Sequence, residues 1–372
     1  MSWRIGRWLA FGAAVCLAGL LAAAFFPMPF RYAAPKFSPP ADYAAAKALI
    51  ESKIARAPLT LSEAGRPRVF LHDAPTEHVF VLLHGLTNSP EQFDKLGRIL
   101  FGRGHNVVIP RTPGHGDADL MTDALSVFTA KAMLDYANLA ITLARPLGRH
   151  LTVAGLSING ATTAWVAQNR GDVDRAVLLA PFFAPRGLPP FAVKPLSRLL
   201  VRLPNVFLWW DPVHKDQFFA DSHAYPRFST RSIGETMRLG AGVFGESGKS
   251  APACGAILVV TTASDLAANN AVTARLAANW REHHPASLAA YEFPASDNVP
   301  HDFIDPSQSD QRVDLVYPRL IEMLETGKPP DQEKARIIPG GDSNPHPASR
   351  AAPSTSTTTT RPCERSFPFA TN

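Results

Sequence analysis

Short apolar runs alternate with amphipathic segments along most of this chain, and this alternation restricts the possible folds more than any other feature. Residues 78–85 (HVFVLLHG), 105–110 (HNVVIP) and 150–155 (HLTVAG) are apolar runs of strand length, and helical patterns separate them. A regular alternation of strands and helices is typical of a parallel β-sheet with helices on both faces. We therefore predict an α/β fold with a mostly parallel central sheet.

The alternation continues through the second half of the chain. Apolar runs at 175–181, 254–265 and 287–294 predict three further strands. Helical patterns lie between and after the apolar runs, at 89–104, 126–145, 157–170, 267–284 and 312–325. The first helix has clear start signals, because Ser89 can cap it and Pro90 suits a first helical position.

A long segment interrupts the alternation between residues 182 and 250. It is rich in proline, leucine and aromatic residues, among them Trp209 and Trp210. It is too long and too apolar for a simple loop. We predict that residues 182–250 form an inserted cap over the carboxyl ends of the strands, which is where ligands bind in open α/β sheets.

The N-terminus carries a candidate membrane segment. Arg4 and Arg7 precede an uncharged apolar stretch at 8–26, and roughly 17–25 apolar residues suffice for a helix to cross a bilayer. Basic residues before such a stretch favour a cytoplasmic N-terminus. We favour an uncleaved anchor over residues 1–26. A signal peptide cleaved near residues 22–24 is the second interpretation, and a buried core helix is the third.

Both leading interpretations place the globular part outside the cytoplasm. It is then membrane-anchored, in the periplasm if the source is bacterial, or secreted if the segment is cleaved. Residues 27–60 begin with a Pro-rich stretch and are predicted to be a spacer. Residues 327–372 are rich in Pro, Ser and Thr and are predicted to be a disordered tail. The globular domain is therefore expected at 61–326.

Charge and composition exclude some functions. The net charge of +5 is modest, and Lys and Arg residues form no long run, so we expect no nucleic-acid partner. The three cysteines lack the spacing of metal ligands. The acidic loop at 117–123 lacks the glycine and the distal glutamate of a calcium loop. We therefore expect no metal site.

A serine stands at a position that suits a nucleophile. The stretch VAGLSINGA at 153–161 places Ser157 at the end of a predicted strand and the start of a predicted helix. A sharp turn there projects the side chain above the sheet edge and directs the helix N-terminus towards it. A serine hydroxyl is a poor nucleophile until a base removes its proton.

The sequence around this serine resembles the α/β-hydrolase family. Gly155, Ser157 and Gly160 are similar to the Gly-x-Ser-x-Gly motif of that family, except that Asn159 stands where glycine is expected. The stretches LLHGLTNSPEQF and PRTPGHG also resemble its monoacylglycerol lipase and carboxylesterase branch. The resemblance covers about residues 67–325, and it implies an α/β-hydrolase fold with a cap between the sixth and seventh strands.

The resemblance also implies a catalytic triad. In this family the chain order is serine, then aspartate or glutamate, then histidine. His301 follows the last predicted strand, and Asp265 follows a buried predicted strand. Asp265 equally suits a helix N-cap, and Asp297 and Asp302 are alternative acids close to His301. We expect Ser157, Asp265 and His301 to be catalytic.

Two backbone N–H groups are expected to bind the oxyanion that forms during acyl transfer. By the resemblance, one belongs to Ile158, directly after the nucleophile, and the other to Leu86, in the loop after the strand at 78–85. His84 is expected to be structural rather than catalytic.

The expected activity is that of a serine hydrolase that cleaves carboxylic esters, with a small-molecule or lipid ester as substrate and no cofactor. Lipid-like or medium-chain acyl esters are the expected substrates, because the inserted segment is apolar. The same triad also suits an amidase or an acyltransferase. A membrane-tethered binding module that kept the fold, with Asn159 in its favour, and an interaction protein that recruits a partner through its tail are further alternatives. The sequence predicts no oligomeric state.

Overall fold

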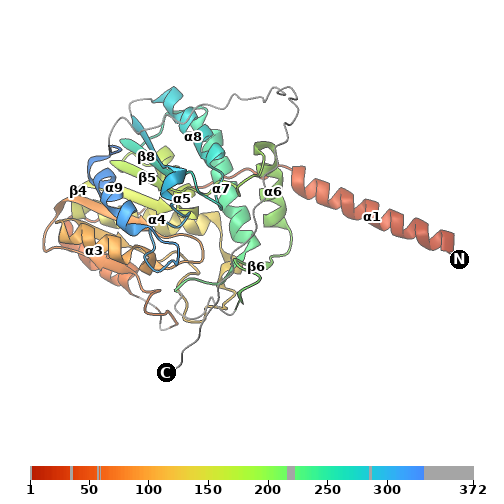
Figure 1. Ribbon diagram of the computed structural model, residues 1–372, viewed down its shortest axis with the longest axis horizontal. Coiled ribbons are helices and arrows are strands. Elements are labelled where there is room, and N and C mark those ends of the chain that lie inside the picture. The colour runs from red at the N-terminus through yellow and green to blue at the C-terminus, as the bar shows by residue number, and fades with distance from the viewer. Residues whose placement is uncertain are drawn as a thin grey trace, which may run out of the picture. The chain divides into compact units, whose positions relative to one another are not determined.

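The computed structural model describes residues 2–33, 37–56, 58, 60–215, 223–284 and 287–330 (Figure 1). A seven-stranded sheet in the order β1-β3-β2-β4-β5-β8-β9 forms its centre. The strands are β1 (Arg68–Phe70), β2 (Thr76–Leu83), β3 (Asn106–Ile109), β4 (Gly148–Leu156), β5 (Arg175–Leu179), β8 (Ala256–Thr262) and β9 (Leu288–Phe293). Only β1 runs antiparallel to its neighbour. The predicted mostly parallel sheet is confirmed.

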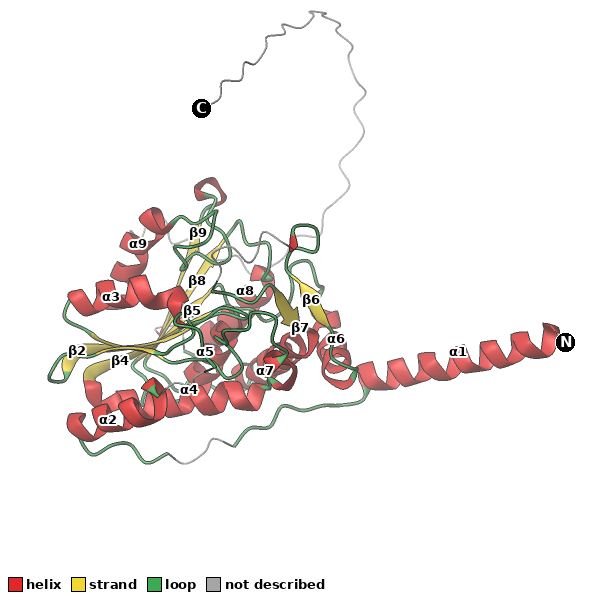
Figure 2. Ribbon diagram, turned by 90° about the horizontal axis from the view of Figure 1, so that it is seen from below, coloured by secondary structure: helices red, strands yellow, loops and turns green. Residues whose placement is uncertain are grey.

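Helices cover both faces of the sheet (Figure 2). Along β2, Val79 and Val81 belong to the buried cluster of one face, and Phe80 and Leu82 belong to that of the other, so the strand is buried on both sides. One face carries α3 (Asp94–Gly102) and α9 (Val313–Thr326). The other carries α2 (Tyr43–Ile50), α4 (Ala130–Ala144), α5 (Ile158–Asn169), α7 (Thr230–Ser247) and α8 (Asn270–His283). Single turns of other helix types lie at 51–55, 90–93, 124–127, 145–147 and 295–297.

The stretch expected to be a spacer contains a packed helix. Asp42 caps α2 by accepting a hydrogen bond from the Ala45 N–H at 2.8 Å. Ala46 and Ile50 are fully buried in the core beneath α4. The folded unit therefore begins before residue 61.

The predicted insertion lies between β5 and β8. It contains α6 (Pro190–Arg202), the two-stranded sheet of β6 (Phe207–Trp209) and β7 (Arg227–Ser229), and α7. Because α7 packs on α5, it belongs to the layer that covers the sheet. β5 and β8 are the fifth and sixth strands of the described sheet, not the sixth and seventh, because only β1 precedes β2.

The two ends of the chain carry the predicted membrane segment and the predicted disordered tail. Helix α1 (Ser2–Phe25) forms over the N-terminal apolar stretch, and its segment Ile5–Phe25 is long and apolar enough to cross a membrane. Its side chains are mostly exposed. The disordered tail predicted at 327–372 lies outside the described residues from 331 onwards.

Candidate active site

Ser157 occupies a sharp turn between β4 and α5. Its φ of 56° and ψ of −114° lie in a region that non-glycine residues rarely adopt. The Ser157 N–H donates to the Leu179 carbonyl oxygen at 2.9 Å, and the Ser157 carbonyl oxygen accepts from the Phe182 N–H at 2.9 Å. Both bonds tie the turn to the chain at the end of β5. The neighbouring backbone therefore holds Ser157 in its strained conformation.

Two glycines allow the turn to be this tight. A Cβ on Gly155 would lie 2.2 Å from the Asn159 carbonyl oxygen, so no larger residue fits where β4 approaches α5. A Cβ on Gly160 would lie 2.6 Å from the Cα of Pro181, on the chain that leaves β5. The glycine placed one residue later than in the family motif therefore permits the close approach of α5 to its neighbour.

The structure brings the three expected catalytic side chains together. His301 Nε2 lies 3.0 Å from Ser157 Oγ, and His301 Nδ1 lies 2.7 Å from Asp265 Oδ2. These residues come from three separate strand ends, after β4, β8 and β9. The arrangement permits proton transfer from the hydroxyl to the imidazole, with the carboxylate fixing the ring.

Asp265 is held in its ionised form. Burial alone would raise its pKa, but the hydrogen bond from His301 and the electrostatic attraction between the carboxylate and that side chain lower it. The N–H groups of Ala267 and Ala268 both donate to Oδ1 at 2.8 Å and act in the same direction. The net pKa is below the ordinary value, so the carboxylate accepts the Nδ1 proton and leaves Nε2 free to act as a base.

The alternative acids are engaged elsewhere. Asp297 pairs with Arg319 at 2.7 Å. Asp302 Oδ2 accepts hydrogen bonds from Gln92 at 2.6 Å and from Asn88 at 3.2 Å. In the described structure the hydrogen bonds of the His301 ring go to Asp265 and Ser157, and neither alternative carboxylate forms one with it.

The two expected oxyanion donors come from distant parts of the chain, directly after the serine and in the loop after β2. Ile158 is the first residue of α5, so its N–H has no acceptor within the helix. Leu86 follows β2 in a loop where Thr87 has a φ of 63°. Within the described residues, neither N–H donates to another group of the protein. Both are therefore available to an oxygen atom placed near Ser157.

Asn159 links the serine turn to the loop after β2, a role that the motif did not suggest. Its Nδ2 donates to the His84 carbonyl oxygen at 2.5 Å and to Thr112 Oγ1 at 3.1 Å. The Thr112 N–H in turn donates to His84 Nε2 at 3.0 Å. Burial holds the pKa of His84 well below its ordinary value, so its ring stays neutral and accepts that bond. In the sequence, the sign of this contact is that asparagine replaces the glycine of the family motif at position 159.

A second polar cluster, not foreseen from the sequence, lies beside the catalytic histidine. Gln92 accepts from the Gly85 N–H at 2.7 Å and donates to Asp302, so it joins the loop after β2 to the residue after His301. Burial and the charge on Asp305 raise the pKa of Asp302 to about 6. Burial would also raise the pKa of Asp305, but His223, 2.8 Å away, lowers it to about 2.

The inserted segment also reaches the loop after β2. The Trp210 indole N–H donates to Thr87 Oγ1 at 2.9 Å, and the Tyr225 N–H donates to the Thr87 carbonyl oxygen at 2.8 Å. Trp209 lies under the Lys215 ammonium instead, 5.1 Å from its ring centre. The segment thus holds the residue next to Leu86 from both its side chain and its backbone.

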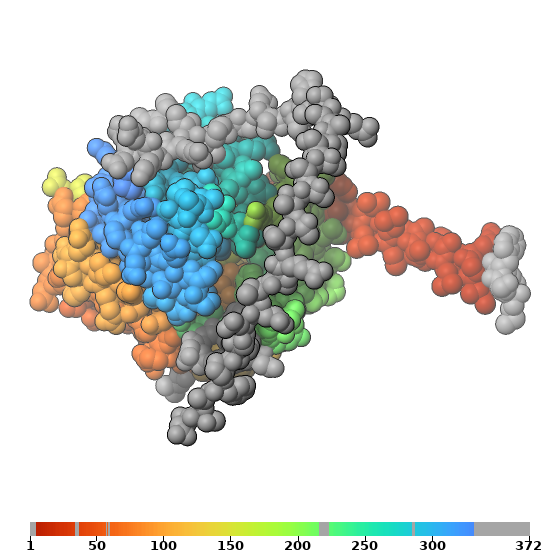
Figure 3. Space-filling view, viewed as in Figure 1, coloured from red at the N-terminus to blue at the C-terminus, as the bar shows by residue number. Residues whose placement is uncertain are grey.

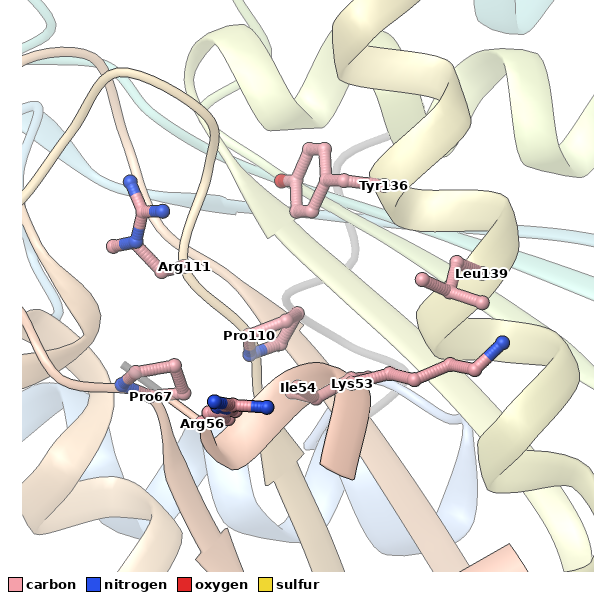
Figure 4. Close-up of a pocket in the computed structure, with 8 residues that line it drawn as sticks. All are labelled: Lys53, Ile54, Arg56, Pro67, Pro110, Arg111, Tyr136 and Leu139. Atoms are coloured by element: carbon pink, nitrogen blue, oxygen red, sulfur yellow. The ribbon is translucent and has the colours of Figure 1, made fainter. Parts of the chain in front are cut away.

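Two cavities lie away from the triad. One, of about 110 Å³, is bounded by apolar residues, by Tyr136 and by basic side chains that include Arg56 and Arg111 (Figure 4). Arg111 already donates to the His115 carbonyl oxygen at 3.1 Å. The other, of about 350 Å³, lies between α6, α7 and α8 and is mostly apolar. The described residues include no cluster suited to a metal ion.

Comparison with known proteins gives one family and a set of similar folds. Residues 80–315 match the family described as the alpha/beta hydrolase family. No curated protein matches the sequence. The structure is similar to a monoacylglycerol lipase from Paleococcus ferrophilus, with a TM-score of 0.54 and 20% identity over 69% of this chain and 97% of that one.

A soluble variant of the Saccharomyces cerevisiae monoglyceride lipase gives a TM-score of 0.52 at 13% identity, over 80% of this chain and 98% of that one. A structure reported with the metagenome-derived lipolytic enzymes LipS and LipT gives 0.51 at 17% identity, over 71% and 99%. At these identities the likeness establishes the fold.

Proposed function

Because this chain belongs to the alpha/beta hydrolase family, we propose that it is a serine hydrolase that cleaves carboxylic esters. The observation that carries the proposal is the chain of contacts from Ser157 Oγ to His301 at 3.0 Å and from His301 to Asp265 at 2.7 Å. A buried carboxylate, a histidine with Nε2 directed at a hydroxyl, and two available N–H groups are what acyl transfer to serine requires.

The reaction follows from these positions. His301 Nε2 takes the Ser157 proton as Oγ attacks the ester carbonyl carbon, and the oxyanion accepts hydrogen bonds from Leu86 and Ile158. His301 then gives the proton to the departing alcohol oxygen, which leaves an acyl-enzyme. A water molecule, deprotonated by the same nitrogen, attacks the acyl carbon, and the carboxylic acid leaves as Ser157 regains its proton.

We propose lipid-like or medium-chain acyl esters as substrates. The inserted segment carries exposed apolar side chains, among them Leu208, Trp210 and Val213. The neighbouring structures include a monoacylglycerol lipase and a monoglyceride lipase, which supports an acyl ester of a small alcohol.

We also propose that α1 anchors the protein in a membrane without being cleaved, with the catalytic domain outside the cytoplasm. The length and apolar character of Ile5–Phe25 and the preceding Arg4 support this. Retention of the protein in the membrane fraction after alkaline washing, together with an intact mass that includes residues 1–26, tests it. A mass that starts beyond residue 22 contradicts it.

Two measurements test the proposed chemistry. A fluorophosphonate probe should label the protein at Ser157, and the substitution Ser157→Ala should abolish both labelling and hydrolysis of p-nitrophenyl esters. A series of those esters with increasing acyl length should give the highest kcat/KM for medium or long chains. An unlabelled but folded protein would instead support a non-catalytic binding module. Asn159 no longer favours that alternative, because its contacts stabilise the serine turn.

A further inference from the structure

The C-terminal end of α1 is bound by two arginines of α6. Arg202 Nη1 donates to the carbonyl oxygens of Ala23 at 2.5 Å and Phe26 at 2.9 Å. Arg198 Nη1 donates to those of Phe25 at 3.1 Å and Ala24 at 3.3 Å. The last carbonyl groups of a helix have no donor within the helix, and cations there also oppose its dipole. The two arginines therefore supply what the end of α1 lacks.

The spacing on α6 suits this contact. Arg198 and Arg202 are four residues apart, so their side chains leave the same face of the helix one turn from each other. Ala24, which faces this contact, is only 5% exposed, whereas the earlier part of α1 is largely exposed. The end of α1 lies against α6 in the space-filling view as well (Figure 3).

The residues after α1 are also docked. A Cβ on Gly242 of α7 would lie 2.8 Å from a ring carbon of Phe30, so the missing side chain makes room for that ring. The Arg238 guanidinium lies 5.2 Å from the centre of the same ring. Tyr32 donates to Asp135 at 2.9 Å. Residues 23–32 therefore contact three helices of the domain in succession.

We propose that α6 and α7, together with Asp135 of α4, form a docking surface for residues 23–32 of this chain, which joins the membrane anchor rigidly to the inserted segment. The docking contact itself lies within the chain. The orientation of the domain at a bilayer rests on the proposed anchoring by α1.

The docking has a consequence for the inserted segment. Arg202, the last residue of α6, contacts the carbonyl groups at the point where α1 leaves the bilayer. Exposed apolar side chains follow it directly, at Leu203, Val206, Leu208, Trp210 and Val213. With α6 fixed at this point, the partner of this apolar stretch is the bilayer surface around α1. Lys194, Arg198 and Arg202 favour anionic headgroups there.

Trypsin cleavage after Arg31 measures the docking, because Arg31 is exposed within the docked residues. The double variant Arg198→Ala/Arg202→Ala should release the fragment that begins at Tyr32, identified by intact mass, on the order of tenfold faster than the unmodified protein. Fragments cut after Lys36 differ in mass and are counted separately. The variant Lys194→Ala is the matched control, because Lys194 lies on α6 without a hydrogen bond or ion pair to the described residues of α1. Equal rates for the double variant and the unmodified protein would overturn the proposal.

A second variant leaves both arginines in place. Gly242→Val fills the space of the Phe30 ring and should also speed release of the fragment that begins at Tyr32. Unchanged kcat/KM on a soluble short-chain ester shows that each variant is folded. The proteolysis is measured in detergent, so its result stands even if α1 proves not to anchor the protein.

In vesicles that contain phosphatidylglycerol, hydrolysis of an embedded long-chain ester should fall at least about threefold in the double variant. An unchanged rate there would overturn the orientation at the bilayer.

Discussion

The side-chain amide of Asn159 donates a 2.5 Å hydrogen bond to the backbone carbonyl oxygen of His84. This bond joins the helix that follows the nucleophile to the strand end that leads into Leu86. The two proposed oxyanion donors, Leu86 and Ile158, are thus each one or two residues from one end of the same contact. Asn159 therefore ties together the two segments of the chain that carry these donors.

Asn159→Ala should lower kcat at least about tenfold with little change in KM, because misplaced oxyanion donors weaken binding of the transition state more than binding of the ester. Loss of the buried hydrogen bonds should also reduce the free energy of unfolding by about 1–3 kcal/mol. Steady-state kinetics and urea unfolding measure the two effects. Asn159→Gly, which restores the family motif, should behave in the same way. Asn169→Ala, near the end of α5, is the control, and an equal effect there would contradict the assigned role.

Asp265→Asn should lower kcat by about 10⁴-fold while the protein stays folded, because an amide no longer fixes the tautomer or stabilises the imidazolium. The asparagine keeps a side-chain oxygen that can accept the hydrogen bonds from the Ala267 and Ala268 N–H groups. Asp302→Asn removes a carboxylate that is next to His301 in sequence but forms no hydrogen bond with its ring. If Asp302→Asn caused the larger loss, the acid would be wrongly assigned.

Asp302 should make stability depend on pH. Burial and the charge of Asp305 raise its pKa to about 6, above the value near 3.8 of a free side chain. Between these two values the native state binds more protons than the unfolded state, so this contribution to stability is full below about pH 4 and is lost as pH rises through about 6. Asp302→Asn should therefore gain stability relative to the unmodified protein between pH 5 and pH 8, on the order of 2 kcal/mol. Urea unfolding at both pH values measures this. Asp297→Asn, which removes an acid paired with Arg319, should show no such gain.

Trp210→Phe should lower kcat/KM severalfold for every ester in an acyl-length series. The substitution keeps an aromatic ring but removes the indole N–H that holds Thr87, next to Leu86. An equal effect on all chain lengths indicates disturbed oxyanion binding, whereas an effect restricted to long chains would place Trp210 in the acyl pocket instead. Trp209→Phe is the control, because Trp209 stacks with Lys215.

Local patterns in the sequence explain why much of the fold was predictable. The apolar runs at 78–85, 150–155 and 175–181 became strands buried on both faces, since a continuous apolar run suits a central parallel strand. The edge strand β1 has three half-buried residues, which is too short for a periodic signal. Helix α2 was missed because its eight residues follow a Pro-rich stretch.

In the candidate site, too, the sequence predicts some residues and gives no sign of others. Ser157, Asp265 and His301 each stand at a strand end, so a pattern of strands places them at one edge of the sheet. The contacts of Gln92 with Asp302 and of His223 with Asp305 join residues far apart in the chain. Such pairs have no local spacing, so a single sequence offers no sign of them.

Helix α2 has a practical consequence for anyone who shortens this protein. A fragment that starts where the family match begins, at residue 80, would lack the helix that buries Ala46 and Ile50, and also the edge strand β1. The apolar underside of α4 would then face water, and an exposed apolar patch of this kind promotes aggregation. Recombinant material without the anchor should therefore retain the chain from Phe30 onwards.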